Sequence, residues 1–160
     1  MNQVRRVISG GQSGVDRAAL DFAIVHGVPY GGWCPKGGWA EDMIVPPGLL
    51  VHYPHLRETP DSDPKQRTRW NVRDSNATLI FLPRDGVASS PGTAFAIACA
   101  RELARPFLIA HLWDVDGSTR IREWLGERAD AFALNIAGPR ETQAPGIYAA
   151  VREALDAVWR

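Results

Sequence analysis

A glycine-rich stretch near the N-terminus constrains the fold of this chain more than any other feature. Residues 9–14 read Ser-Gly-Gly-Gln-Ser-Gly, and they follow Val4–Ile8, a short run rich in β-branched apolar residues. Apolar residues then recur at helical spacing from Val15 to Ala23. The order is therefore strand, glycine-rich turn, helix, which points backbone N–H groups at the helix start toward a bound anion.

This turn predicts an anion or phosphate site formed by Gly10, Gly11, Gln12, Ser13 and Gly14. Glycine suits such a turn because a side chain would hold a ligand away from the backbone. The alternative is that the glycines only make a tight connection between strand and helix. The spacing matches neither the dinucleotide fingerprint nor the NTPase phosphate loop, so it argues against an ordinary NAD or ATP site.

Composition limits the function classes. The 160 residues suffice for one domain, and 18 Lys and Arg balance 18 Asp and Glu, which argues against nucleic acid or an anionic membrane as a partner. The two cysteines, Cys34 and Cys99, suit a reducing compartment better than a disulfide framework. The sequence has no secretory signal and no apolar run long enough to span a membrane. We therefore expect residues 1–160 to form a single cytoplasmic domain.

Apolar runs and helical patterns alternate along the chain. Strands are predicted at residues 4–8, 29–34, 77–82, 106–112 and 132–136, with a further short strand at 51–53. Helices are predicted at 15–26, 65–75, 94–104, from 117 onward and from 147 onward. The helix at 94–104 is apolar nearly all round and should be buried, and the helix from Gly117 should turn Ile121, Trp124, Leu125 and Ala129 inward. This alternation predicts a Rossmann-like three-layer α/β domain with a mainly parallel sheet.

Ligands of such sheets bind beyond the carboxyl ends of the strands. The loops at Gly10, Trp33, Pro83 and Gly138 all follow predicted strands, so they can converge on one site. The long loop from residue 35 to 48 is also expected to be functional, because long loops in compact domains often are.

Several blocks of the sequence resemble the putative molybdenum carrier family, and they extend over nearly the whole chain. They are ISGGQSGVDRAALD at 8–21, GWCPKG at 32–37, AED at 40–42, RTRWNVRDS at 67–75, Gly92-Thr93, and AGPRE at 137–141. The resemblance implies a Rossmann-like superfamily that also contains lysine-decarboxylase-like proteins and binds nucleotide-derived ligands at two glycine-bearing loops. It implies a cytoplasmic homo-oligomer, a dimer or tetramer, that binds and protects the molybdenum cofactor, a phosphorylated pterin, for molybdoenzyme recipients.

The second glycine-bearing turn contains Ser90, Gly92 and Thr93, and we expect these three residues to bind the same ligand. Lys36 lies between glycines and tryptophans and is a candidate for anion binding; the alternative is a solvated loop lysine. The tryptophan rings of this loop are suited to stacking on a flat heterocycle.

Two further polar residues are candidates. Arg140 follows a strand and Gly-Pro, which would aim its guanidinium at the shared cleft, although it could instead form only a surface pair with Glu141. Asn71 shares a helical face with Arg67 and Asp74, either to position a ligand or as part of a structural polar network.

No catalytic residue and no metal site is predicted. His52 and His55 lack a cysteine or carboxylate cluster to complete a metal site, and both thiols are expected to be buried and inert.

The alternative functions are a nucleoside-monophosphate N-glycosidase, as found in the same superfamily, and a nucleotide-ligand sensor. The related enzymes carry a catalytic glutamate within a turn of the Gly-Thr loop, whereas the first acid after Thr93 here is Glu102. Asp74 or Glu141 would have to replace that glutamate, so a carrier rather than an enzyme is expected.

Overall fold

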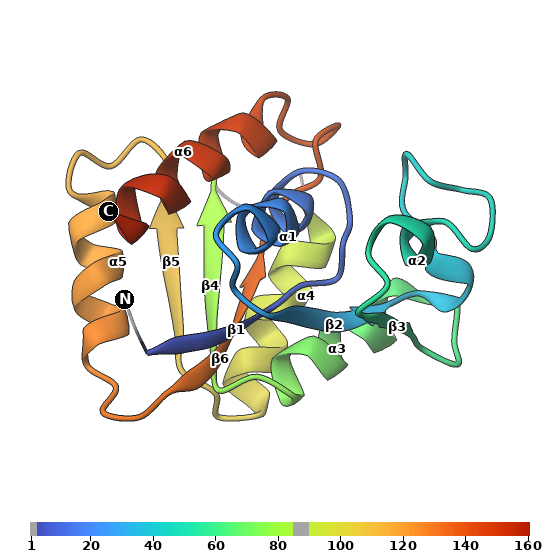
Figure 1. Ribbon diagram of the computed structural model, residues 1–160, viewed down its shortest axis with the longest axis horizontal. Helices are drawn as coiled ribbons and strands as arrows, with labels where there is room; N and C mark the ends of the chain where they lie inside the picture. The colour runs from blue at the N-terminus through green and yellow to red at the C-terminus, as the bar shows by residue number, and fades with distance from the viewer. Residues whose placement is uncertain (1–2, 85–89) are drawn as a thin grey trace.

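The computed structural model describes residues 3–84 and 90–160, and within these it contains a six-stranded, all-parallel sheet (Figure 1). The strand order is β3-β2-β1-β6-β4-β5. The strands are β1 (Val4–Ile8), β2 (Tyr30–Cys34), β3 (Leu56–Glu58), β4 (Ala77–Leu82), β5 (Phe107–His111) and β6 (Phe132–Ala137). The predicted Rossmann-like α/β fold with a parallel sheet is confirmed.

The described part of the chain also contains six α-helices and one 3-10 turn. They are α1 (Val15–Val25), η1 (Lys36–Gly38), α2 (Leu49–His52), α3 (Pro64–Arg73), α4 (Pro91–Glu102), α5 (Gly117–Gly126) and α6 (Ile147–Trp159). Helices α1 and α5 both pack against α6, while α3 packs against α4. None of these helices is both long and apolar enough to cross a membrane.

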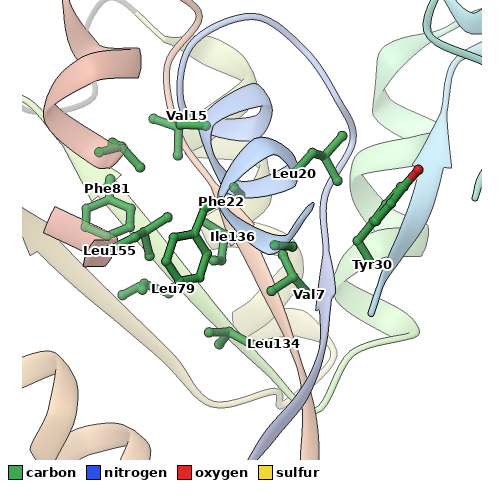
Figure 2. Close-up of a cluster of buried hydrophobic side chains, with 14 of the residues drawn as sticks. Val7, Val15, Leu20, Phe22, Tyr30, Leu79, Phe81, Leu134, Ile136 and Leu155 are labelled. Carbon is green, nitrogen blue, oxygen red and sulfur yellow. The ribbon is translucent and has the colours of Figure 1, made fainter. Parts of the chain in front are cut away.

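Alternate residues of β4 show how the sheet divides the two helix groups. Leu79 and Phe81 join the main core with Phe22 of α1 and Leu155 of α6, as Figure 2 shows. Ile80, which points the other way along the strand, packs with Ile97 of α4. The sheet is therefore the middle of three layers, and its central strands are buried on both faces.

The chain leaves neighbouring strands toward opposite layers at the centre of the sheet. The segment after β6 leads to α6, and the segment after β4 leads to α4 on the other face (Figure 1). A crevice forms at such a switch point, beyond the carboxyl ends of the strands. The loop predicted from residue 83 to 90 follows β4, and its residues 85–89 lie outside the described residues.

Three details of the prediction are wrong. Residues 51–53 do not form a strand, because Gly48 turns the chain into α2 and the N–H of Tyr53 donates to the carbonyl oxygen of Leu49. The neighbouring strand is β3, which pairs with β2 in parallel. Helix α4 is buried on one face only, since Ala94 and Ala98 are exposed. Helix propensity explains the exposed alanines of α4, and the end of α5 explains the third wrong detail, which is the exposure of Ala129.

Alanine favours helices without needing burial, so an alanine-rich helix reads as more apolar than its packing requires. Ala129 is exposed because it lies beyond the end of α5, whereas Ile121 and Leu125 are buried as predicted. The local apolar pattern therefore predicts where these helices lie, but it does not predict how much of each helix surface is buried.

Candidate functional site

A cavity of about 400 Å³ opens at the carboxyl ends of β1 and β6, between these ends and the starts of α3 and α4. This volume is in the range of small-molecule sites. Of the residues predicted to bind a ligand, seven line the cavity: Gly10, Gln12, Asn71, Ser90, Gly92, Thr93 and Arg140. The other four, Gly11, Ser13, Gly14 and Lys36, are not part of its wall.

The glycine turn between β1 and α1 is largely occupied by the chain itself. The N–H of Gly11 donates to Ser9 Oγ at 3.3 Å, and that of Val15 donates to the carbonyl oxygen of Pro139 at 3.2 Å. The N–H of Ser13 donates to the side chain of Gln12 at 3.0 Å. These N–H groups already have acceptors, so the phosphate site predicted within this turn stays a prediction.

Close packing explains why glycine is required at position 14. The residue has φ of +78°, and a Cβ atom there would meet the backbone of Pro139 and lie 2.7 Å from the nitrogen of Glu141. The hydroxyl of Ser13 donates to Glu41 and accepts from the N–H of Glu141 at 3.1 Å. The start of α1 is thus covered by residues 139–142 and by the loop that carries Glu41.

The start of α4 has a different environment. Ser90, Gly92 and Thr93 line the cavity, and a Cβ atom at Gly92 would meet nothing within 4 Å. The hydroxyls of Ser90 and Thr93 are 2.6 Å apart. The first N–H groups of a helix have no intrahelical partner, and α4 has 12 residues, so its start offers donors and a positive dipole end to an anion.

A buried polar group forms the inner wall of the cavity. The guanidinium of Arg67 donates from Nη1 to the carbonyl oxygen of Gly10 at 3.1 Å and lies 3.7 Å from Asp16 Oδ2. Within residues 3–84 and 90–160, Nε of Arg67 and Nε2 of Gln12 are buried without a hydrogen-bond partner. A ligand in the cavity could supply the missing acceptors.

Burial also changes the acid–base properties of this wall. It raises the pKa of Asp16 from 3.8 to about 6, against the opposing effect of the Arg67 charge. Burial likewise lowers the pKa of Arg67, with the Asp16 charge acting in the opposite direction. Sequence reasoning considered Arg67 only with Asn71 and Asp74 on one helical face and gave Asp16 no role in the site, because nothing in the sequence places Asp16 next to Arg67.

Asn71 lines the cavity, yet its amide is bound to the main chain. Its Oδ1 accepts from the N–H of Trp33 at 2.7 Å, and its Nδ2 donates to the carbonyl oxygen of Trp33 at 2.9 Å. This pair of bonds ties α3 to β2, which is the structural alternative considered for Asn71. The indole of Trp33 donates to Asp74 at 2.8 Å and packs edge-on against Trp70.

The aromatic ring on the cavity wall is Phe95 rather than a tryptophan. The ammonium of Lys65 lies 5.9 Å from the centre of this ring. Arg140 also lines the cavity, with its guanidinium 5.4 Å from the centre of the Trp39 ring and 3.9 Å from Glu41 Oε2. Lys36 is exposed, away from this wall.

The carboxylates considered as catalytic replacements lie elsewhere. Asp74 forms an ion pair with Arg73 at 2.7 Å, and Glu141 accepts from the N–H groups of Gly146 and Tyr148 at the start of α6. Glu102 is exposed and pairs with Arg69. In the described part of the chain, the carboxylates that line the cavity are those of Asp16 and Asp63.

The remaining candidates for chemistry lie outside the cavity wall. Cys34 and Cys99 are both buried, and burial raises the pKa of the Cys34 thiol to about 11. Among the described residues, no group of three His, Cys, Asp or Glu side chains is arranged to hold a metal ion. His52 and His55 are exposed.

A family profile matches residues 7–159, which is nearly the whole chain. The chain belongs to the circularly permutated YpsA SLOG family. In this SLOG chain the C-terminal strand β6 lies between β1 and β4, at the centre of the sheet.

The fold also matches a crystal structure from Syntrophus aciditrophicus SB, at 40% sequence identity and a TM-score of 0.86. The match covers 99% of this chain and 96% of that chain, whose name is Putative molybdenum carrier protein. The resemblance to the molybdenum carrier family is therefore confirmed. No curated protein matches the chain.

Proposed function

We propose that this SLOG protein binds the molybdenum cofactor, a phosphorylated pterin, in the cavity at the carboxyl ends of β1 and β6. The single observation that carries the proposal is the composition of the cavity wall. One part is the start of α4 with Ser90, Gly92 and Thr93, and the other is a buried polar group that includes Arg67. The name of the Syntrophus protein supports molybdenum as part of the cargo.

Each end of such a ligand has a matching part of the wall. The phosphate would accept hydrogen bonds from the start of α4, where donors and the helix dipole favour an anion. Arg140 adds a positive charge to the same cavity. The pterin ring would lie against Phe95 and the buried polar group, since a flat heterocycle needs both an apolar face and polar edges.

The residues of α4 support a carrier of the cofactor rather than an N-glycosidase. Cleavage of an N-glycosidic bond develops positive charge on the sugar, so it needs a carboxylate close to the bond. The first acid of α4 is Glu102, which is exposed and paired with Arg69. A homo-oligomer, molybdoenzyme recipients and a cytoplasmic location stay predictions.

Mass spectrometry of the small molecule that copurifies with the protein tests the proposal. We expect a phosphorylated pterin with the wild-type chain and with Lys36→Ala, and its loss with Gly92→Val, which adds a branched side chain to the cavity wall at the start of α4. A wild-type protein that copurifies with no pterin contradicts the proposal.

Incubation with AMP and GMP tests the enzymatic alternative. We expect no release of free base, because α4 carries no acid near its start. Release of base that is abolished by Asp16→Asn, with nucleotide binding retained, would identify the protein as a glycosidase.

A further inference from the structure

We infer that Gln12, Asp16 and Arg67 recognise the 2-amino-4-oxopyrimidine edge that pterins share with guanine. The inference rests on the proposed function and names the part of the ligand that this wall reads. All three residues line the cavity and are almost fully buried, with 4%, 8% and 7% of their surfaces exposed. Two of them also have polar atoms without a partner in the described residues, Nε2 of Gln12 and Nε of Arg67.

The chain itself fixes the direction of these unpaired groups. Oε1 of Gln12 accepts from the N–H groups of Ser13 and Glu41, at 3.0 and 2.9 Å. The amide nitrogen of Gln12 is therefore the end left for another partner, and the hydrogen-bond network assigns it as a donor. Arg67 is likewise held by the carbonyl oxygen of Gly10 and by Asp16. Buried donors left without acceptors are costly, so their retention points to a ligand.

The pattern of donors and acceptors matches one kind of ring edge. A 2-amino-4-oxopyrimidine presents a carbonyl oxygen beside a ring N–H and an amino group, which together offer one acceptor and two adjacent donors. The carbonyl oxygen suits Nε of Arg67 and Nε2 of Gln12. The ring N–H and the amino group suit the two oxygens of an Asp16 carboxylate, since a carboxylate accepts paired donors.

Other ligand parts fit this wall less well. A phosphate would meet the negative charge of Asp16, and the edge of adenine lacks the two adjacent donors. Near neutral pH the carboxylate is mostly ionised, because burial raises the pKa of Asp16 only to about 6. Asp16 is therefore an acceptor when the ring binds.

Ligand pairs that differ at one position test the inference on the wild-type protein. One pair is GMP and IMP, which differ by the 2-amino group, and the other is 6-hydroxymethylpterin and 6-hydroxymethyllumazine. Titration calorimetry at pH 7.5 should show at least a tenfold preference for the amino member of a pair. Preference within the pterin pair or the nucleotide pair identifies which source of the ring the protein uses.

Two variants extend the test. Asp16→Asn should reduce the preference to below threefold, because an amide offers only one acceptor oxygen. Asp63→Asn is the matched control, since Asp63 is the exposed carboxylate on the wall and its N-cap bond to Lys65 is available to asparagine too. This control should keep the full preference.

The outcomes separate the inference from the proposed function. Equal affinity for both members of each pair overturns the inference and leaves the proposed function standing. Absence of binding by all four probes overturns the proposed function, and the inference with it. Loss of preference in Asp63→Asn as well as Asp16→Asn would also overturn the assignment to Asp16.

Discussion

The two glycine-bearing turns of this protein look alike in sequence but differ in what surrounds them. The turn between β1 and α1 gives Gly10 and Gln12 to the cavity wall, but its Gly14 end is covered by residues 139–141, and Val15 donates its N–H to Pro139. The start of α4 instead faces a cavity, with open space around Gly92. Glycine in a strand-to-helix turn therefore serves close backbone packing in one place and lies beside open space in the other, and only the neighbouring segments decide which.

A carboxylate of the chain itself lies beside the covered turn. Glu41 accepts from the hydroxyls of Ser13 and Thr142 and from the N–H of Thr142. Burial alone would raise the pKa of Glu41, but these hydrogen bonds lower it below its ordinary value. The protein thus places its own anion beside α1, whereas we propose that the start of α4 binds an anion from outside.

The largest expected effect separates the two turns by stability. Gly14→Ala should lower the free energy of unfolding by about 3 kcal/mol or more, because Gly14 has φ of +78° and its Cβ would meet backbone atoms. Gly92→Ala should change it by less than about 1 kcal/mol, since the added methyl group meets open space. Urea unfolding of both variants measures the difference. Equal losses would mean that the turns do not differ in packing.

The second effect concerns the acid that lies between the covered turn and the cavity. Because burial raises the pKa of Asp16 from 3.8 to about 6, the folded protein binds this proton more tightly than the unfolded chain. The stability from this group is therefore complete below pH 3.8 and is lost as the pH rises through about 6, by at most about 3 kcal/mol.

The charges that face the Asp16 carboxyl group are those of Arg67, Arg17 and Arg140, and all three oppose the rise of its pKa. Urea unfolding between pH 4 and 7 should show a stability term that falls with pH in the wild type and is missing in Asp16→Asn. The difference between the two profiles isolates this term from other carboxylates such as Glu41. Parallel profiles would mean that Asp16 titrates normally.

The smallest expected effect is on ligand affinity, and it distinguishes the cationic side chains of Arg140 and Lys36. Arg140→Ala should weaken binding of a phosphorylated pterin or of GMP by about 1–3 kcal/mol, because Arg140 lines the cavity. Lys36→Ala should change it by less than about 0.5 kcal/mol, since Lys36 is exposed outside the wall. Titration at low and high salt measures both, and the salt dependence should flatten only in Arg140→Ala. A larger loss of ligand affinity in Lys36→Ala would indicate that the ligand binds at the loop of residues 35–48 instead.

The sequence by itself determined the order of elements and the class of fold. Buried strands such as Ala77–Leu82 are apolar throughout because both faces are covered, and helices such as Ile147–Trp159 carry an apolar stripe. Both are local properties, so they can be read from short windows of sequence. The short strand β3 escaped prediction because its three residues carry too little pattern to distinguish a strand from a turn.

Only the tertiary structure decided which residues form the site. Whether the N–H of Val15 is available depends on Pro139, and the environment of Asp16 depends on Arg67, which lies on a distant helix. Long-range packing brings these partners together, and nothing within one segment encodes which distant group will satisfy a donor. The same packing left donors of Gln12 and Arg67, two residues of the cavity wall, without an acceptor in the described part of the chain.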